Sequence, residues 1–281
     1  MPNTSELQNI SSQVRRDIVR MVHAVQSGHP GGSLGCADYL TALYFKIMDI
    51  KPNAFTQEGL NEDVFFLSNG HISPVFYSVL ARSGYFPVSE LSTFRKLNSR
   101  LQGHPTTHEG LPGVRIATGS LGQGLSVACG MAEAKKLNGD DHIVYVTVGD
   151  GELQEGQNWE AIMYAGHRKL NNIIVAVDYN KQQIDGNVID IMSFTELRKK
   201  FEAFSWQVLE MNGNDMQDIL DTNAKAQSMR SEGKPIVILM RTEMGFGVDF
   251  MMGSHEWHGI APNDEQLARA LNQLPETLGD Y

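Results

Sequence analysis

The chain contains 281 residues, 41% of them hydrophobic, which is enough to bury a sizeable core and excludes a globally disordered chain. It carries 33 acidic residues against 23 Lys and Arg, and the formal net charge of −10 argues against a nucleic-acid-binding surface and against a polybasic membrane patch. We recognise no secretory signal and no apolar run as long as a membrane span. Its two cysteines, Cys36 and Cys129, lie in apolar surroundings typical of buried, reduced thiols. We therefore expect a cytoplasmic protein that binds neither nucleic acid nor membrane.

The spacing of apolar residues predicts helices that alternate with short strands. In chain order, the first half is expected to contain a helix over residues 5–27, a glycine-rich break over 27–35, a helix over 36–48, a strand over 62–71, a helix over 73–85 and an irregular polar stretch from about 89 to 119. The second half is expected to contain a glycine-rich turn and helix over 119–139, a strand over 142–151, a helix over 157–169, a strand over 171–180, a helix over 216–233, a strand over 234–242, and a glycine-rich loop, short helix and polar tail over 245–281.

This order of elements predicts the fold class. Strands that alternate with helices indicate parallel βαβ units in a doubly wound sheet. The expected strands are almost wholly apolar, as strands are when helices cover both faces of a sheet. We therefore predict one α/β domain over residues 1–281, a three-layer α/β/α sandwich with a mainly parallel sheet.

Polar residues follow each expected strand. The strands end in Ser68-Asn69-Gly70-His71, in Gly149-Asp150-Gly151, in Asp178-Tyr179-Asn180 and in Arg241-Thr242-Glu243. Ligands of open parallel sheets bind beyond the carboxyl ends of the strands, so Asp150 and Asn180, at the ends of successive strands, can face one crevice. One carboxylate and one amide oxygen suit Mg²⁺ or Ca²⁺, completed by phosphate oxygens and water, better than zinc.

The glycines around Asp150 support the same interpretation. Gly149 and Gly151 remove side chains, so that backbone can approach a phosphate group, and the helix after Gly156 offers free N–H groups and a positive dipole end. The alternative is a turn aspartate that only caps the next helix. The matching Asn180 after the next strand favours a metal that holds a diphosphate.

Several histidines stand in turns. His29, His71 and His104 each neighbour Gly or Pro, and loops beyond strand ends are where binding groups gather. Imidazoles there can move protons to and from sugar hydroxyls near neutral pH. Isolated histidines are more often exposed or structural, and a metal role is a further alternative, although their spacing shows no zinc pattern.

Longer motifs resemble those of the transketolase family. The stretch "GDGELQEGQNWEA", followed by "VDYNKQQIDG", is similar to the thiamine diphosphate motif of that family. Five further stretches follow the family's order between about residues 15 and 260: "SGHPGGSLG", "LSNGHISPVFY", "LQGHP", "GLPGVRIATGSLGQGLSVACGMA" and "GFGVDFMMGSHEWHG". The resemblance implies a thiamine diphosphate-binding fold.

The resemblance also implies a role for each matching position. The metal ligands for Mg²⁺ (or Ca²⁺) are Asp150, Asn180 and the backbone carbonyl of Gln182, where the family often has isoleucine. The residues that contact thiamine diphosphate are His71, Gly119, Leu121, Gly151, Glu155, Asn180, Ile184 and His258. The catalytic set is His29, His71, His104, His258 and Glu155, the last being the acid that couples two cofactors across a subunit interface. His255 is a weaker candidate on the same loop.

The resemblance covers one part of a transketolase. The family's second domain supplies a glutamate to the aminopyrimidine ring of the cofactor, and we see no counterpart of it in this chain. We therefore expect the diphosphate-binding subunit of a split transketolase, in an α2β2 complex with a separate pyrimidine-binding subunit. It would transfer a two-carbon ketol unit from a ketose or ketose phosphate to an aldose or aldose phosphate.

Other functions fit the sequence less well. A subunit of a different thiamine diphosphate enzyme, such as a deoxyxylulose-phosphate synthase relative or a decarboxylating dehydrogenase, is an alternative, and the histidine set argues against it. A second alternative is a non-catalytic partner subunit. The intact metal, diphosphate and substrate positions argue against it. The identity of the sugar does not follow from these residues.

Overall fold

A computed structural model, which describes residues 1–193 and 195–281, contains the expected parallel sheet. Its five strands are β1 (Val64–Leu67), β2 (Val144–Gly149), β3 (Ile173–Asp178), β7 (Ile236–Arg241) and β6 (Gln207–Asn212), in this spatial order. Every neighbouring pair is parallel. The carboxyl ends of all five strands therefore lie at the same edge of the sheet.

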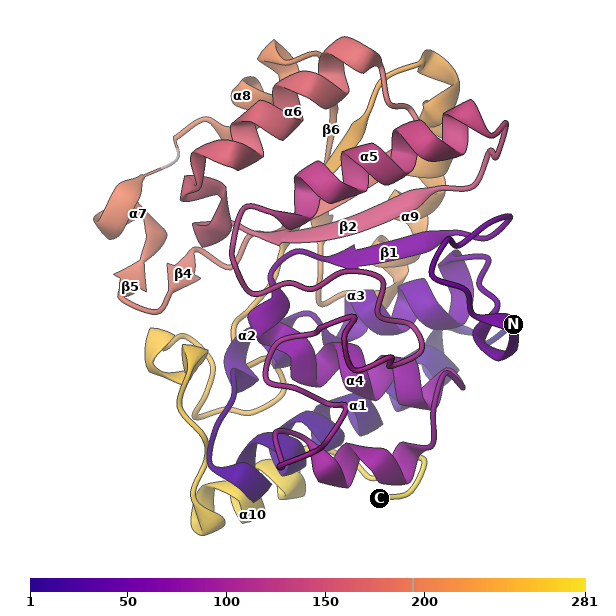
Figure 1. The fold of residues 1–281 in the computed structure, drawn as a ribbon. Coiled ribbons are helices and arrows are strands. Elements are labelled where there is room, and N and C mark those ends of the chain that lie inside the picture. The colour runs from indigo at the N-terminus through magenta and orange to yellow at the C-terminus, as the bar shows by residue number, and fades with distance from the viewer. Residues whose placement is uncertain (194) are drawn as a thin grey trace.

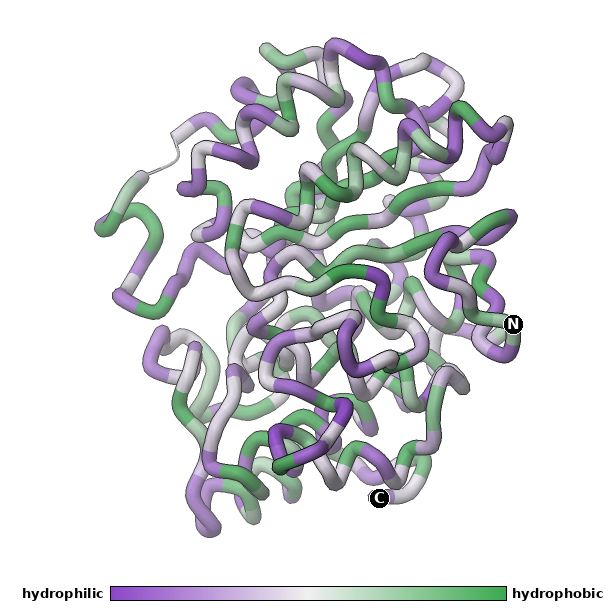
Figure 2. The backbone as a smooth tube through the Cα atoms, viewed as in Figure 1, coloured by the Kyte–Doolittle hydropathy of each residue, from purple (hydrophilic) through white to green (hydrophobic). Residues whose placement is uncertain are grey.

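Helices cover both faces of the sheet, as Figure 1 shows. One layer contains α1 (Thr4–Val25), α3 (Ala37–Ala42), α4 (Ser73–Arg82), α9 (Met216–Met229) and α10 (Asp264–Gln273), and the other contains α5 (Gly124–Leu137), α6 (Gly156–Arg168) and α8 (Leu197–Ala203). Alternate strand residues enter the two cores: Phe65 and Tyr145 face the first, and Phe66 and Val146 face the second. The predicted three-layer sandwich is confirmed, and Figure 2 shows apolar residues along the central strands.

Some elements differ from the sequence prediction. The glycine-rich break contains α2 (Pro30–Gly35), a short helix whose six residues are all buried, with proline at its first position. The helix expected over 36–48 continues from α3 as a π-turn over Leu43–Ile47. The elements that were not predicted include the half-buried edge strand β6 and the helix α8.

The remaining elements are short. A hairpin of β4 (Gln182–Gln183) and β5 (Gly186–Asn187) leads into α7 (Val188–Met192). The 3-10 helices cover Pro52–Ala54, Gly70–Ile72, Val88–Thr93, Gly151–Gln154, Arg230–Glu232 and His255–His258. The thiols of Cys36 and Cys129 are buried and free, as expected. In the described part of the chain, no helix combines the length and apolar character that crossing a bilayer requires.

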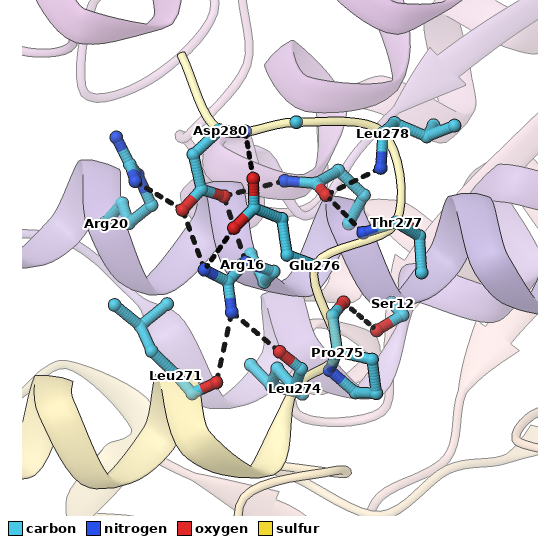
Figure 3. Close-up of polar contacts among 12 residues, drawn as sticks. Ser12, Arg16, Arg20, Leu271, Leu274, Pro275, Glu276, Thr277, Leu278 and Asp280 are labelled. Carbon is cyan, nitrogen blue, oxygen red and sulfur yellow. Dashed lines mark hydrogen bonds and ion pairs between the residues drawn. The ribbon is translucent and has the colours of Figure 1, made fainter.

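Residues 274–281, here named the C-terminal strap, lie against the first helix of the chain (Figure 3). Arg16 of α1 donates to the carbonyls of Leu271 and Leu274 at 3.0 and 2.7 Å and to the Asp280 carboxylate at 2.9 and 2.7 Å. Arg20 pairs with the same carboxylate at 2.6 Å. Most of the Arg16 side chain is buried, so these charge-assisted bonds fix the strap to the helix layer.

Candidate active site

The carboxyl ends of β1, β2 and β3 open into one cavity of about 450 Å³. The predicted site residues that line it are His29, His71, Gly119, Leu121, Asp150, Gly151, Glu155, Asn180, Gln182, Ile184 and His258. His104 lies beside the cavity, with its ring centroid 6.2 Å from that of His29. His255 is exposed and does not line it. Segments that are far apart in the sequence therefore meet where the strand ends predicted a ligand.

Backbone groups hold the two candidate metal ligands in place. Asp150 follows β2, and its carboxylate accepts hydrogen bonds from the backbone N–H of Gly151 at 2.8 Å and of Lys181 at 2.6 Å. Asn180 follows β3, and its Oδ1 accepts a hydrogen bond from the backbone N–H of Gln182 at 2.9 Å. Because carboxylate and amide oxygens carry further lone pairs, both side chains retain capacity for a cation.

The electrostatics of the Asp150 carboxyl fit a cation site. Burial, together with the nearby charge of Asp178, raises the pKa of Asp150 to about 8, and burial also raises the pKa of Asp178. A divalent cation offsets this cost, and an all-oxygen donor set suits Mg²⁺ or Ca²⁺. Within the described residues, no cluster of three His, Cys, Asp or Glu side chains is arranged to hold a metal ion. A cation at Asp150 must therefore take other ligands from Asn180, from backbone and from a bound molecule.

Asp178 is a functional candidate that the sequence analysis did not single out. It is the last residue of β3, is 3% exposed and accepts hydrogen bonds from Asn180 Nδ2 at 3.0 Å and from the hydroxyl of Thr242. Because Nδ2 is held by Asp178, the oxygen of the Asn180 amide is turned away from Asp178. The sequence signal for Asp178 is its spacing from Asn180. Residues two apart on an extended chain lie on the same face, so Asp178 can contact the candidate metal ligand.

Glu152 is a second residue that the sequence analysis missed. Its buried carboxylate accepts hydrogen bonds from the Ser68 hydroxyl and from the backbone N–H groups of Gly122 and Gly149, both at 3.0 Å. It therefore ties the end of β1 and the glycine-rich loop before α5 to the turn that carries Asp150. Burial raises the pKa of Glu152. In the sequence, Glu152 follows Gly151 in the way that exposed acidic residues commonly begin a helix. The local sequence therefore gives no signal that its carboxylate is buried and joins these segments.

Four histidines gather at one side of the cavity. The ring centroid of His29 lies 5.2 Å from that of His71 and 5.5 Å from that of His258, and the His71 and His258 centroids are 5.0 Å apart. His29 directly precedes α2, His71 lies in the turn after β1, and His258 lies in the 3-10 helix His255–His258. Gly119, with φ +123°, allows His104 to pack closely, because a Cβ there would lie 2.6 Å from the His104 ring.

The histidines favour their neutral forms. Burial and the charge of neighbouring histidines lower the pKa of His29 to about 4, and the same causes lower the pKa of His71. Burial, with the nearby Arg95 guanidinium, lowers the pKa of His104, and burial with the nearby His255 lowers that of His258. Near pH 7 each ring therefore offers one donor and one acceptor nitrogen, which suits binding of neutral hydroxyl and carbonyl groups.

Several buried polar atoms in the cavity wall lack hydrogen-bond partners. In the part of the chain that the structure describes, His29 Nδ1, Asn69 Nδ2, Gln182 Oε1 and His258 Nδ1 are buried and make no hydrogen bond. Such atoms are costly to leave unsatisfied, so their concentration here fits a polar ligand with donors and acceptors. Asn69 was part of a predicted strand-end motif, although no role was assigned to it.

The mouth of the cavity is partly apolar and partly acidic. Ile184, in the turn of the β4–β5 hairpin, is 60% exposed, and Leu121 and Ile191 also line the cavity. Glu155 is exposed at the start of α6. The cavity thus combines a candidate cation site, a histidine cluster and an apolar wall, which would suit a diphosphate-bearing cofactor that has an aromatic part.

Comparisons with known proteins agree with this geometry. Residues 7–276 match the family described as "Transketolase, thiamine diphosphate binding domain". The chain is 39% identical over 272 residues to one of the subunits of the apulose-4-phosphate transketolase of Actinobacillus succinogenes, with 96% of each protein covered. It is 37% identical over 270 residues to the 6-deoxy-6-sulfo-D-fructose transketolase subunit SqwG of Clostridium sp., again with 96% of each covered.

The fold is also that of a solved transketolase. The crystal structure of the transketolase from Campylobacter jejuni matches 97% of this chain with a TM-score of 0.89 and 36% identity. The chain spans 43% of the length of that transketolase. The predicted family and the predicted thiamine diphosphate-binding α/β fold are confirmed. The chain belongs to the transketolase family and corresponds to its thiamine diphosphate-binding domain.

Proposed function

We propose that this chain binds thiamine diphosphate with Mg²⁺ and, together with a separate pyrimidine-binding subunit, transfers a two-carbon ketol unit from a ketose to an aldose. The observation that carries the proposal is the meeting of two groups in one cavity. The buried oxygen ligands of Asp150 and Asn180 suit a metal-diphosphate, and the neutral histidine cluster suits a polyhydroxylated substrate.

Each part of the cavity has a task in this proposal. Asp150, Asn180 and the backbone carbonyl of Gln182 would hold Mg²⁺, or Ca²⁺ in its place, and Gly151 leaves backbone open to the diphosphate. Gly119, Leu121 and Ile184 would contact the rest of the cofactor. When bound, thiamine diphosphate supplies the electron sink that lets a carbon–carbon bond beside a carbonyl break and re-form.

The histidines would bind the substrate and move its protons. His29 Nδ1 and His258 Nδ1 lack hydrogen-bond partners in the described structure, so they are free to bind a hydroxyl or carbonyl oxygen. His71 and His104 would complete the set around the sugar. Neutral imidazoles can take a proton from a hydroxyl at one nitrogen while donating at the other, which is general acid–base catalysis.

Both the relatives and the surface support a separate partner chain. Three relatives of matching length are named as transketolase subunits rather than as whole enzymes. Beside the cavity, Ile184, Ile189 and Met192 are exposed by 60, 68 and 52%, and such a group of apolar side chains is typical of an interface. We propose an α2β2 complex, with Glu155 near the contact between two copies of this chain.

A reconstitution experiment tests the proposal. The chain is expressed with and without the product of the adjacent gene, and ketol transfer is measured with added thiamine diphosphate and Mg²⁺. We expect activity only in the mixture, and we expect Asp150→Ala to abolish it. Asp221→Asn, which removes an exposed carboxylate on α9, is the matched control and should retain activity.

Cofactor binding separates the possible failures. Quenching of tryptophan fluorescence by thiamine diphosphate reports binding to the complex independently of turnover. A stable complex that binds the cofactor but transfers no ketol unit from any ketose would show that the reaction class is wrong. Activity of the isolated chain would instead contradict the need for a partner.

A further inference from the structure

Asn69 is a buried amide after β1 whose nitrogen has no partner. Its side chain is 1% exposed and lines the active-site cavity, and its Nδ2, which carries two N–H donors, makes no hydrogen bond. Within the described residues, other buried asparagines also have an atom without a partner, but this atom is the oxygen, and the nitrogen donates to a backbone carbonyl: Asn158, Asn172 and Asn223. Because a buried donor is costly to leave unpaired, Asn69 Nδ2 calls for a ligand.

The hydroxyl of Thr147 sets the orientation of this amide. Thr147 lies on β2, is fully buried and donates to Asn69 Oδ1 at 3.1 Å. Because this bond holds the oxygen, the nitrogen is the end of the amide that is left for the cavity. Thr147 does not itself line the cavity, so its hydroxyl can act on a bound molecule only through Asn69.

The residues on both sides of Asn69 hold its backbone in place. The preceding Ser68 donates from its hydroxyl to the Glu152 carboxylate. The following Gly70 packs against the loop before α5, where an added Cβ would lie 2.8 Å from the backbone nitrogen of Gly119. The amide is therefore placed by its neighbours before a ligand binds, which reduces the entropy that binding costs.

Asn69 lies on the cation side of the cavity. Because β1 and β2 are neighbours in the sheet, it sits beside the turn that carries Asp150, and a Cβ added to Gly149 would lie 3.9 Å from the Cβ of Asn69. Asn69, Asp150 and Asn180 thus follow three adjacent strands. The carboxylates of Asp150 and Glu152 accept their hydrogen bonds from other donors, so neither occupies the Asn69 amide.

We infer that Asn69 is a further cofactor-binding residue, which donates a hydrogen bond from Nδ2 to an anionic oxygen of the diphosphate held at Asp150, and that Thr147 is the positioning residue that orients it. The inference rests on the proposed function and deepens it, because it adds a donor to the same site. An amide carries no charge, so it can bind the diphosphate without competing with the cation for the buried carboxylates.

Cofactor binding to the reconstituted complex tests the inference without turnover. Tryptophan fluorescence is titrated with thiamine diphosphate at saturating Mg²⁺, and inorganic diphosphate is then titrated as a competitor, so that each variant yields two dissociation constants. We expect Asn69→Ala to raise both constants about 10- to 100-fold, which corresponds to about 1.4 to 2.7 kcal/mol for a hydrogen bond to a charged acceptor. The two constants should rise together, because the two ligands share only the diphosphate.

A second variant tests the role of Thr147. Thr147→Val keeps the branched shape but removes the hydroxyl, and should raise both constants about 3- to 10-fold. In the Asn69→Ala background the same change should add nothing, because the hydroxyl then has no amide to orient. Asn212→Ala is the matched control. It removes an asparagine at the end of β6, at the same edge of the sheet but outside the cavity, and should leave both constants unchanged.

Other outcomes overturn the inference. A rise for thiamine diphosphate alone would mean that the donor serves another part of the cofactor. Unchanged constants for Asn69→Ala would mean that Nδ2 does not contact the cofactor, and additive effects of the two substitutions would contradict orientation by Thr147. If Asn69→Ala does not fold, as its thermal midpoint without cofactor would show, unchanged constants for Thr147→Val refute the inference. If the wild-type complex binds no thiamine diphosphate, the proposed function itself fails, and this result differs from all the others.

Discussion

Replacing Asp150 by asparagine in the metal-free chain tests the electrostatics of the candidate cation site. The Asp150 carboxyl has a pKa of about 8 in the folded chain and an ordinary pKa of 3.8 in the unfolded chain. At a pH between these two values the folded carboxyl is protonated and the unfolded carboxyl is ionised. Folding therefore takes up a proton between these values. The contribution of Asp150 to the free energy of unfolding falls by about 1.36 kcal/mol for each pH unit as pH rises through this window.

The expected magnitude follows from the width of the window. Over its whole range the change amounts to roughly 6 kcal/mol, which is a large share of the stability of an ordinary domain. Asparagine lacks the titrating group, so this dependence disappears. It cannot accept both backbone hydrogen bonds, from Gly151 and Lys181, which costs about 1–3 kcal/mol at every pH. The variant should therefore be the less stable protein near pH 4 and the more stable one near pH 8.

The assay is urea unfolding in EDTA at pH 5, 6, 7 and 8, followed by tryptophan fluorescence. The free-energy difference between Asp150→Asn and wild type should rise steadily with pH. His29 has a pKa of about 4 in the folded chain, so its contribution lowers the free energy of unfolding of both proteins as pH falls below 6.5. This contribution is the same in wild type and variant and cancels in the difference. Asp221→Asn shows how much of the difference comes from removing a charge alone.

Adding ligands should reduce the stability advantage of Asp150→Asn near pH 8. With Mg²⁺ and thiamine diphosphate at about 100 times their dissociation constants, the wild-type chain should gain about 2.7 kcal/mol and Asp150→Asn should gain none. A free-energy difference that stays constant from pH 5 to 8 would refute the reasoning. It would show that Asp150 is ionised in the folded, metal-free chain.

Two further predictions concern carboxylates in different parts of the molecule. Asp178→Asn weakens the hold on the Asn180 side-chain amide and should weaken Mg²⁺ binding about 10- to 100-fold. Calorimetric titration of Mg²⁺ at a fixed concentration of thiamine diphosphate measures this affinity. An unchanged affinity would mean that Asp178 does not orient Asn180. Asp280→Asn should lower the free energy of unfolding by about 1.5–3 kcal/mol at pH 7, measured with urea. Because Arg16 lowers the pKa of Asp280, this loss should shrink as pH falls below 3.8, and a pH-independent loss would contradict the ion pair.

The sheet could be predicted from the sequence because its signal is local. Runs such as residues 144–149 and 173–178 are apolar almost throughout, as strands covered on both faces must be, and each ends in polar residues at the edge where the cavity lies. The edge strand β6 went unassigned because one of its faces is solvated, so its apolar residues alternate and its pattern is weaker. The helix α2 went unassigned because tertiary burial, rather than helix propensity, holds its glycines.

The candidate site was predictable to the extent that its residues end strands or match longer motifs. Asp150 and Asn180 were found from strand position, and the histidines from turns and from the family resemblance. Their roles in binding and catalysis remain predictions. Glu152 could not be found this way, because the hydroxyl of Ser68 is 84 positions away in sequence and the N–H of Gly122 is 30 positions away. Only the folded topology brings these donors to one carboxylate.

The C-terminal strap has a consequence for how the protein is made. The bonds between Arg16 and Asp280 join residues 264 positions apart, and α1 also packs against α4 and α10. During synthesis the first helix therefore emerges long before its ionic partner exists, and the cation stays hydrated until the strap follows. Contacts of such sequence separation slow folding, because a long loop must close before they form. The contact between Arg16 and Asp280 can therefore form only after the strap has been synthesised, and the helix layer around α1 should be the last region to gain protection from hydrogen exchange.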